Sequence, residues 1–131
     1  MKKILIVEDM PDKRDQLIQF LNKENIEFEV CEYVNHALRY ISANRDSIAG
    51  IILDLGLETL PGSYDFTLYR GLDVADEMKR LKLDIPILIN STTELEMATS
   101  EYPNIFGHRT EMDDYETLEN FVSFLRERDK Q

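Results

Sequence analysis

The chain has 131 residues, of which 43% are hydrophobic and 31% are charged, a composition typical of one globular domain. Its formal net charge of −11 disfavours direct binding to nucleic acid, because the phosphate backbone repels an acidic surface. No apolar run approaches the roughly 18 residues of a membrane span, and the single cysteine, Cys31, rules out an internal disulfide. We therefore expect a cytoplasmic protein that contacts neither nucleic acid nor membrane.

The first half of the chain alternates short apolar runs with helical patterns. Residues 4–7 form a continuous apolar run, as in a strand covered on both faces, and Pro11 then favours the start of a helix. Alternation at 27–30 predicts a short edge strand. Apolar residues at helical spacing over 34–41 predict a second helix.

The second half continues the same alternation. Strands are expected at 48–54, 85–90 and 104–108, and helices over 72–81, within 92–101 and over 112–128. Five strands that alternate with helices predict an α/β fold, in which a parallel sheet carries helices on both faces. Ligands of such folds bind at the carboxyl ends of the strands.

Acidic residues follow two of these apolar runs. Glu8 and Asp9 end the first strand and Asp54 ends the third, so the three carboxylates would meet at one edge of the sheet if these strands are neighbours. Carboxylates so close repel one another, and a hard divalent cation such as Mg²⁺ removes the conflict. A carboxylate beside Mg²⁺ can also attack phosphorus and give an aspartyl phosphate. The alternative, that these acids are merely solvated loop residues, fits a single acid better than this set.

A hydroxyl group ends the fourth strand, where the sequence reads ILINSTT. Ser91 could bond a phosphoryl oxygen there, although serine is also a common helix cap. The sequence thus has an acidic pair after strand one, an aspartate after strand three and a serine after strand four. This pattern resembles that of the receiver domain of two-component response regulators. The resemblance covers nearly the whole chain. It implies a single receiver-like domain over 1–131, a doubly wound, flavodoxin-like (βα)5 sandwich whose five-stranded parallel sheet has the order 2-1-3-4-5.

The resemblance also implies roles for individual residues. Asp54 becomes the phosphoacceptor, and Ser91 becomes the hydroxyl that follows the phosphoryl group. Mg²⁺ would be held by Asp54, by Asp9 directly, by Glu8 mostly through water and by the backbone carbonyl of Gly56.

Two features depart from the family pattern. The loop after Asp54 is longer than usual; if Gly71 opens the third helix, an inserted segment covers about 58–70, and its aromatic side chains either form a binding surface or pack on the domain. The expected lysine–proline pair after strand five is absent. Arg109 takes the place of that lysine if Phe106 marks the register, and His108 is the other candidate.

We interpret the sequence as a stand-alone receiver domain rather than an enzyme. A histidine kinase or phosphotransfer protein would phosphorylate Asp54, and the output would be contact with a protein effector whose identity the sequence does not give. The alternative is a phosphorylation-independent pseudo-receiver that acts as a protein-binding module, which the absent lysine and the long loop favour. An aspartate-nucleophile phosphatase is a weaker alternative, because Gly56 stands where such enzymes carry their general acid.

Overall fold

The computed structural model describes residues 1–56, 71–91 and 101–131. Strands and helices alternate along these residues. The strands are β1 (Lys3–Val7), β2 (Phe28–Cys31), β3 (Ile48–Leu53), β4 (Ile87–Asn90) and β5 (Ile105–Arg109). The helices are α1 (Pro11–Lys23), α2 (Val34–Asn44), the short 3₁₀ helix η1 (Arg45–Ser47), α3 (Leu72–Arg80) and α5 (Tyr115–Asp129).

All neighbouring strands of the sheet are parallel, and their order is β2-β1-β3-β4-β5. The predicted fold class and strand order are therefore confirmed. β1 and β3 lie side by side in the middle of this order, with Val7 opposite Leu53 in the register. Their carboxyl ends consequently reach the same edge of the sheet, where the acidic residues follow.

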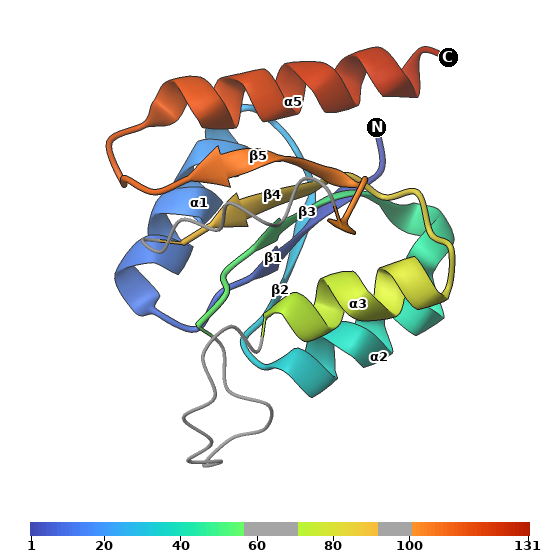
Figure 1. The fold of residues 1–131 in the computed structure, drawn as a ribbon. Helices are drawn as coiled ribbons and strands as arrows, with labels where there is room; N and C mark the ends of the chain where they lie inside the picture. Colours follow the sequence, from blue (N-terminus) through green and yellow to red (C-terminus); the bar gives the residue numbers. More distant parts are fainter. Residues whose placement is uncertain (57–70, 92–100) are drawn as a thin grey trace.

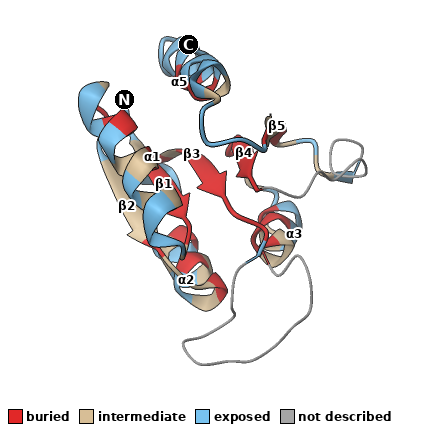
Figure 2. Cartoon of the chain, turned by 90° about the vertical axis from the view of Figure 1, so that its left-hand side faces the viewer, coloured by how far each residue is buried: buried red, intermediate tan, exposed pale blue. Residues whose placement is uncertain are grey.

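The sheet is covered on both faces (Figure 1). α2 and α3 pack on one face, where Leu5 and Leu53 belong to one buried cluster, and α1 and α5 pack on the other, where Ile4 and Ile52 belong to a second. Figure 2 shows β3 buried and the edge strand β2 half-buried. A continuous apolar run predicts this double coverage, because both of its side-chain faces need a partner.

α5 lies close to the sheet because β3 carries a glycine beneath it. A Cβ built on Gly50 would lie 2.7 Å from Leu125 Cδ1 and 3.0 Å from the Phe121 ring. A larger residue would require the ends of these two side chains to shift, so Gly50 allows their close packing on β3.

Several predicted boundaries differ from those observed. The last helix begins at Tyr115 rather than at 112, because the Asp114 side chain caps it by accepting from the Thr117 amide at 3.0 Å. β4 begins at Ile87, after Pro86, which has no amide to donate. The predicted insertion at 58–70 and almost all of the predicted helix at 92–101 lie outside the described residues. None of the helices in the described ranges combines the length and the hydrophobicity that a membrane span needs.

Candidate functional site

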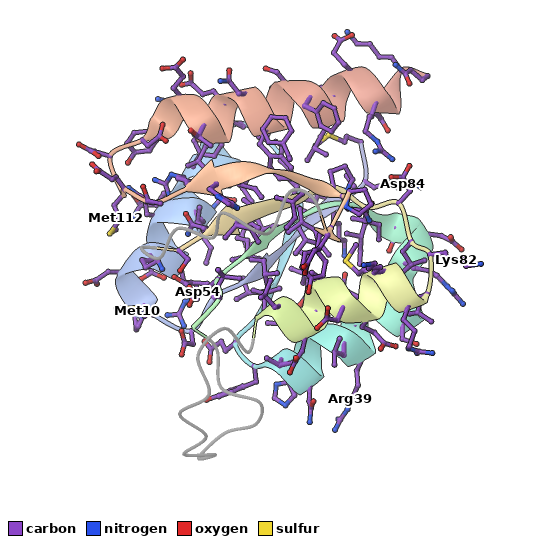
Figure 3. All side chains as sticks on the ribbon, in the orientation of Figure 1. Met10, Arg39, Asp54, Lys82, Asp84 and Met112 are labelled. Atoms are coloured by element: carbon purple, nitrogen blue, oxygen red, sulfur yellow. The ribbon has the colours of Figure 1, made fainter. Side chains whose placement is uncertain are left out.

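Three parallel strands bring their carboxyl ends together beside the start of α1. The Asp54 amide donates to the Val7 carbonyl at 2.9 Å, which joins the end of β3 to the end of β1. The Glu8 amide donates to the Cys31 carbonyl at 3.1 Å, which joins β1 to β2. Figure 3 shows Asp54 at this edge, near Met10, with Lys82 and Asp84 at the opposite edge of the sheet.

Glu8, Asp9 and Asp54 converge at this edge. Each offers a carboxylate oxygen, and these oxygens lie within 4.8 Å of one another. The Glu8 and Asp54 side chains are only 1% and 8% exposed, so their charges are largely withdrawn from water. Burial, together with the neighbouring Asp54 carboxylate, raises the pKa of Glu8 to about 8. The arrangement therefore favours either a bound proton or a cation among the three carboxylates.

Lys13 also reaches this cluster, although no sequence motif singles it out. Its Nζ lies 3.1 Å from Glu8 Oε1 and 3.5 Å from Asp54 Oδ1, and it donates to the Asn90 carbonyl at 3.5 Å. The contact with Glu8 is an ion pair without hydrogen-bond geometry, and neither Glu8 carboxylate oxygen has a hydrogen-bond partner among the described residues. Lys13 lies four residues before the buried Leu17, which puts it on the sheet-facing side of α1. This spacing is the sequence signal that could have pointed to its place in the site.

Ser91 directly follows β4 and is buried. Its amide donates to the Arg109 carbonyl at 3.1 Å, which ties the end of β4 to the end of β5. The preceding residue, Asn90, is also buried, and its Oδ1 accepts from Arg109. Ser91 thus lies at the same edge as the acidic cluster, and its role toward a phosphoryl group stays a prediction.

Arg109 ends β5 and is only 2% exposed. Its guanidinium donates to the Asn90 side chain at 2.9 Å, to Gln16 Oε1 at 2.9 Å, to the Asp114 carbonyl at 2.7 Å and to the Met112 carbonyl. In the described part of the chain, none of its hydrogen bonds or ion pairs goes to Asp54. Arg109 therefore joins β4, α1 and the turn before α5.

The other predicted residues flank the cluster. His108 is half-buried, and its Nε2 has no hydrogen-bond partner among the described residues. Because successive strand residues face opposite sides, His108 lies on the other face of the sheet from Arg109. Gly56 is exposed, and a Cβ built on it would lie 3.9 Å from Asp54 Oδ2. Gly71 directly precedes α3, as expected, and its amide donates to the Leu55 carbonyl at 3.0 Å.

No protein-family model matches the chain, and no curated protein matches it. Solved structures do match. A signal receiver domain from Vibrio parahaemolyticus is 20% identical with a TM-score of 0.77, and the match covers 98% of this chain and 92% of that one. The response regulator protein TrrA from Thermotoga maritima, in complex with Mg(2+)-BeF, is 25% identical with a TM-score of 0.75, over 95% and 99% of the two chains.

TrrA is also matched in its complex with the histidine kinase ThkA. That match has 25% identity and a TM-score of 0.72, and it covers 95% of this chain and 98% of the other. These neighbours are signalling proteins, and each is matched over nearly its whole length. The resemblance found in the sequence is therefore confirmed, and the chain has the fold of a response-regulator receiver domain.

Proposed function

We propose that this protein is a receiver that accepts a phosphoryl group on Asp54 from a histidine kinase or a phosphotransfer protein, with Mg²⁺ bound, and that it signals through contact with another protein. The meeting of Glu8, Asp9 and Asp54 at the carboxyl edge of a sheet with receiver strand order carries the proposal. Two structures of one neighbour, TrrA, support it, since one was solved with Mg(2+)-BeF and the other with a histidine kinase.

The acidic cluster has the donor chemistry that Mg²⁺ requires. Mg²⁺ prefers hard oxygen ligands and is commonly held by one or two carboxylates together with water and phosphate oxygens. Asp9 and Asp54 would bind it directly, Glu8 mostly through water, and the Gly56 carbonyl would complete the protein ligands. The buried Glu8 carboxylate has no hydrogen-bond partner among the described residues, as expected of a group that faces a cation or its water.

Asp54 would supply the nucleophile. One of its carboxylate oxygens attacks the phosphorus of a phosphohistidine, a new O–P bond forms, and the P–N bond breaks as the imidazole leaves with the electron pair and takes up a proton. Bound Mg²⁺ would neutralise charge on the transferring phosphoryl oxygens. The small residual exposure of Asp54 leaves the carboxylate reachable while its backbone is fixed to β1.

Ser91 would link the phosphoryl group to the carboxyl ends of β4 and β5. Its hydroxyl would donate to a phosphoryl oxygen, and its backbone is already bonded to Arg109 at the end of β5. A ligand shifts an equilibrium only through contacts that differ between the two states. The Ser91 contact is such a difference, and it would bias the β4 and β5 region that an effector meets.

Incubation with acetyl phosphate and Mg²⁺, followed by intact-mass measurement, tests this function. The wild-type protein should gain the mass of one phosphoryl group, and Asp54→Asn should gain none. Asp46→Asn is the matched control, because Asp46 is exposed in η1 and should leave the modification unchanged. A wild type that gains no mass, or an Asp54→Asn variant that still gains it, would refute the proposal.

A phosphorylation-independent binding module is the second candidate. Two observations favour it: the sequence has no lysine between Lys82 and Lys130, and the Lys13 ammonium already neutralises part of the acidic cluster. If Asp54→Asn binds the effector as tightly as wild type, and phosphorylation changes that affinity less than about twofold, this candidate replaces the first.

A further inference from the structure

We propose that Lys13, a residue of helix α1, supplies the cation that contacts Asp54 and the phosphoryl group on it, and that the buried Arg109 instead holds the strand ends in place. This inference rests on the proposed function. It moves the phosphoryl-site cation from the end of β5 to the first turn of α1. Lys13 is a catalytic residue in this scheme, since its ammonium touches the carboxylate that reacts.

The contacts of Lys13 place its charge at the reacting group. Nζ lies 3.5 Å from Asp54 Oδ1 and 3.1 Å from Glu8 Oε1, and the side chain is 14% exposed. The same ammonium donates to the Asn90 carbonyl at the end of β4. It therefore lies among the ends of β1, β3 and β4, next to the residue before Ser91. An ammonium has three donors that can turn toward a new acceptor, so it can follow a phosphoryl oxygen without moving α1.

Arg109 is poorly placed for that role, because four of its donors already have acceptors. Four hydrogen bonds hold the guanidinium, and two of them reach the Asp114 and Met112 carbonyls in the turn before α5. Arginine carries five N–H donors, so one has no acceptor among the residues that the structure describes. Turning the group toward Asp54 would leave the buried Asn90 Oδ1 and the partly buried acceptors in Gln16 and the turn without their donor.

Charge balance favours keeping Lys13 in the site when the divalent cation binds. Three ionised carboxylates carry one more negative charge than a divalent ion neutralises. Lys13 provides the remaining positive charge at a place where an unpaired buried charge is costly. A phosphoryl group on Asp54 adds further negative charge and strengthens the need for that ammonium.

The competing explanation is that Lys13 is only a counter-ion of the ion-free protein, which Mg²⁺ displaces into solvent. Lysine footprinting separates the two. The lysine amines are acetylated briefly, and the modification of each lysine is measured by peptide mass. Three samples are compared: the ion-free protein, the protein with Mg²⁺, and the protein with Mg²⁺ plus beryllofluoride, which serves as the phosphoryl probe. We expect Lys13 to be at least about threefold less reactive with beryllofluoride than with Mg²⁺ alone, because its ammonium is then bound. Lys23, exposed on the same helix, should not change.

A kinetic experiment addresses the reaction itself. At saturating Mg²⁺, Lys13→Gln should be phosphorylated by acetyl phosphate at least about tenfold more slowly than wild type, Lys13→Arg should recover part of the rate, and Lys23→Gln should match wild type. Calorimetric Mg²⁺ binding by Lys13→Gln shows that the variant retains a folded site.

The outcomes distinguish the inference from the function on which it rests. The inference is overturned if Lys13→Gln is phosphorylated as fast as wild type or faster, and if Lys13 becomes more reactive toward acetylation once Mg²⁺ is present. The proposed function still stands in that case, provided that the wild type is modified on Asp54. A wild type that acetyl phosphate does not modify overturns both. Slow phosphorylation of Lys13→Gln, together with protection of Lys13 from acetylation by beryllofluoride, supports the assignment of Lys13 as the cation that contacts Asp54.

Discussion

Gly71 lies against Asp54 so closely that a Cβ built on Gly71 would be 2.1 Å from the Asp54 carbonyl oxygen. The same Cβ would lie 2.8 Å from the Leu55 Cα, so two successive backbone positions would be displaced. The Gly71 amide bonds the Leu55 carbonyl, which fixes the start of α3 against the end of β3. The absence of a side chain at position 71 is therefore a condition for the observed position of Asp54.

Gly71→Ala should destabilise the domain and slow phosphorylation. The added methyl group meets backbone rather than a flexible side chain, so we expect a loss of about 1–3 kcal/mol in the free energy of unfolding. Urea unfolding measures the stability, and the acetyl phosphate time course measures the displacement of Asp54.

Gly107→Ala is the matched control, because a Cβ there meets no atom within 4 Å. Its free energy of unfolding should stay within about 0.5 kcal/mol of wild type. Equal stability of the two alanine variants would contradict the close contact between Gly71 and Asp54.

Glu8 should make the ion-free protein less stable as the pH rises. Its pKa is about 8 in the folded protein, against an ordinary value of 4.5 for a solvated glutamate, so the folded state holds a proton that the unfolded state has released between these values. The resulting stabilisation is complete below about pH 4.5 and is lost as the pH rises through 8, a change of a few kcal/mol.

Glu8→Gln removes this titration. In EDTA, the wild type should lose stability relative to Glu8→Gln between pH 5 and pH 8, as measured by urea unfolding at several pH values. Glu119→Gln, at an exposed position of α5, should follow the wild type. A stability difference between wild type and Glu8→Gln that stays constant over this range would show that Glu8 is already ionised in the folded protein.

Arg109→Met should be strongly destabilising. The substitution replaces the guanidinium with an apolar side chain of similar length, and it leaves the Asn90 and Gln16 side chains and two carbonyls without their donor. We expect a loss of at least about 2 kcal/mol in the free energy of unfolding. Arg39→Met, at the exposed surface of α2 (Figure 3), should change it by less than about 0.5 kcal/mol. Similar values for the two variants would mean that the Arg109 hydrogen bonds contribute little.

The main elements of the fold could be predicted because their signals are local. The run at 4–7 is apolar on both sides of the strand, and the chain from 34 to 41 has helical spacing, so neither depends on distant residues. The pairing of β1 with β3 could not be predicted in this way, because no pattern within either strand indicates which strand lies beside it. The strand order followed from the family resemblance, and the structure confirms it.

The site could be predicted only in part, for the same reason. Acids after two strands are visible in the sequence, and the strand order brings them together. The side-chain partners of Lys13 and Arg109 depend on tertiary packing: Arg109 bonds Gln16, which is 93 residues away in the sequence, and Lys13 bonds the Asn90 carbonyl across 77 residues. A lysine on the first turn of a helix can point to solvent or toward the strand ends, and local sequence does not decide between them.

Cys31 should be almost inert in the folded protein. It is buried at the end of β2, and burial, with the nearby charge of Glu29, raises its pKa to about 11 from 9.0. The thiolate is the reactive form, so its fraction at pH 8 should fall roughly a hundredfold on folding. A chromogenic disulfide reagent at pH 8 should react at least that much more slowly with the native protein than with the protein in denaturing urea. Comparable rates in the two conditions would mean that Cys31 is accessible and that this edge of the sheet opens readily.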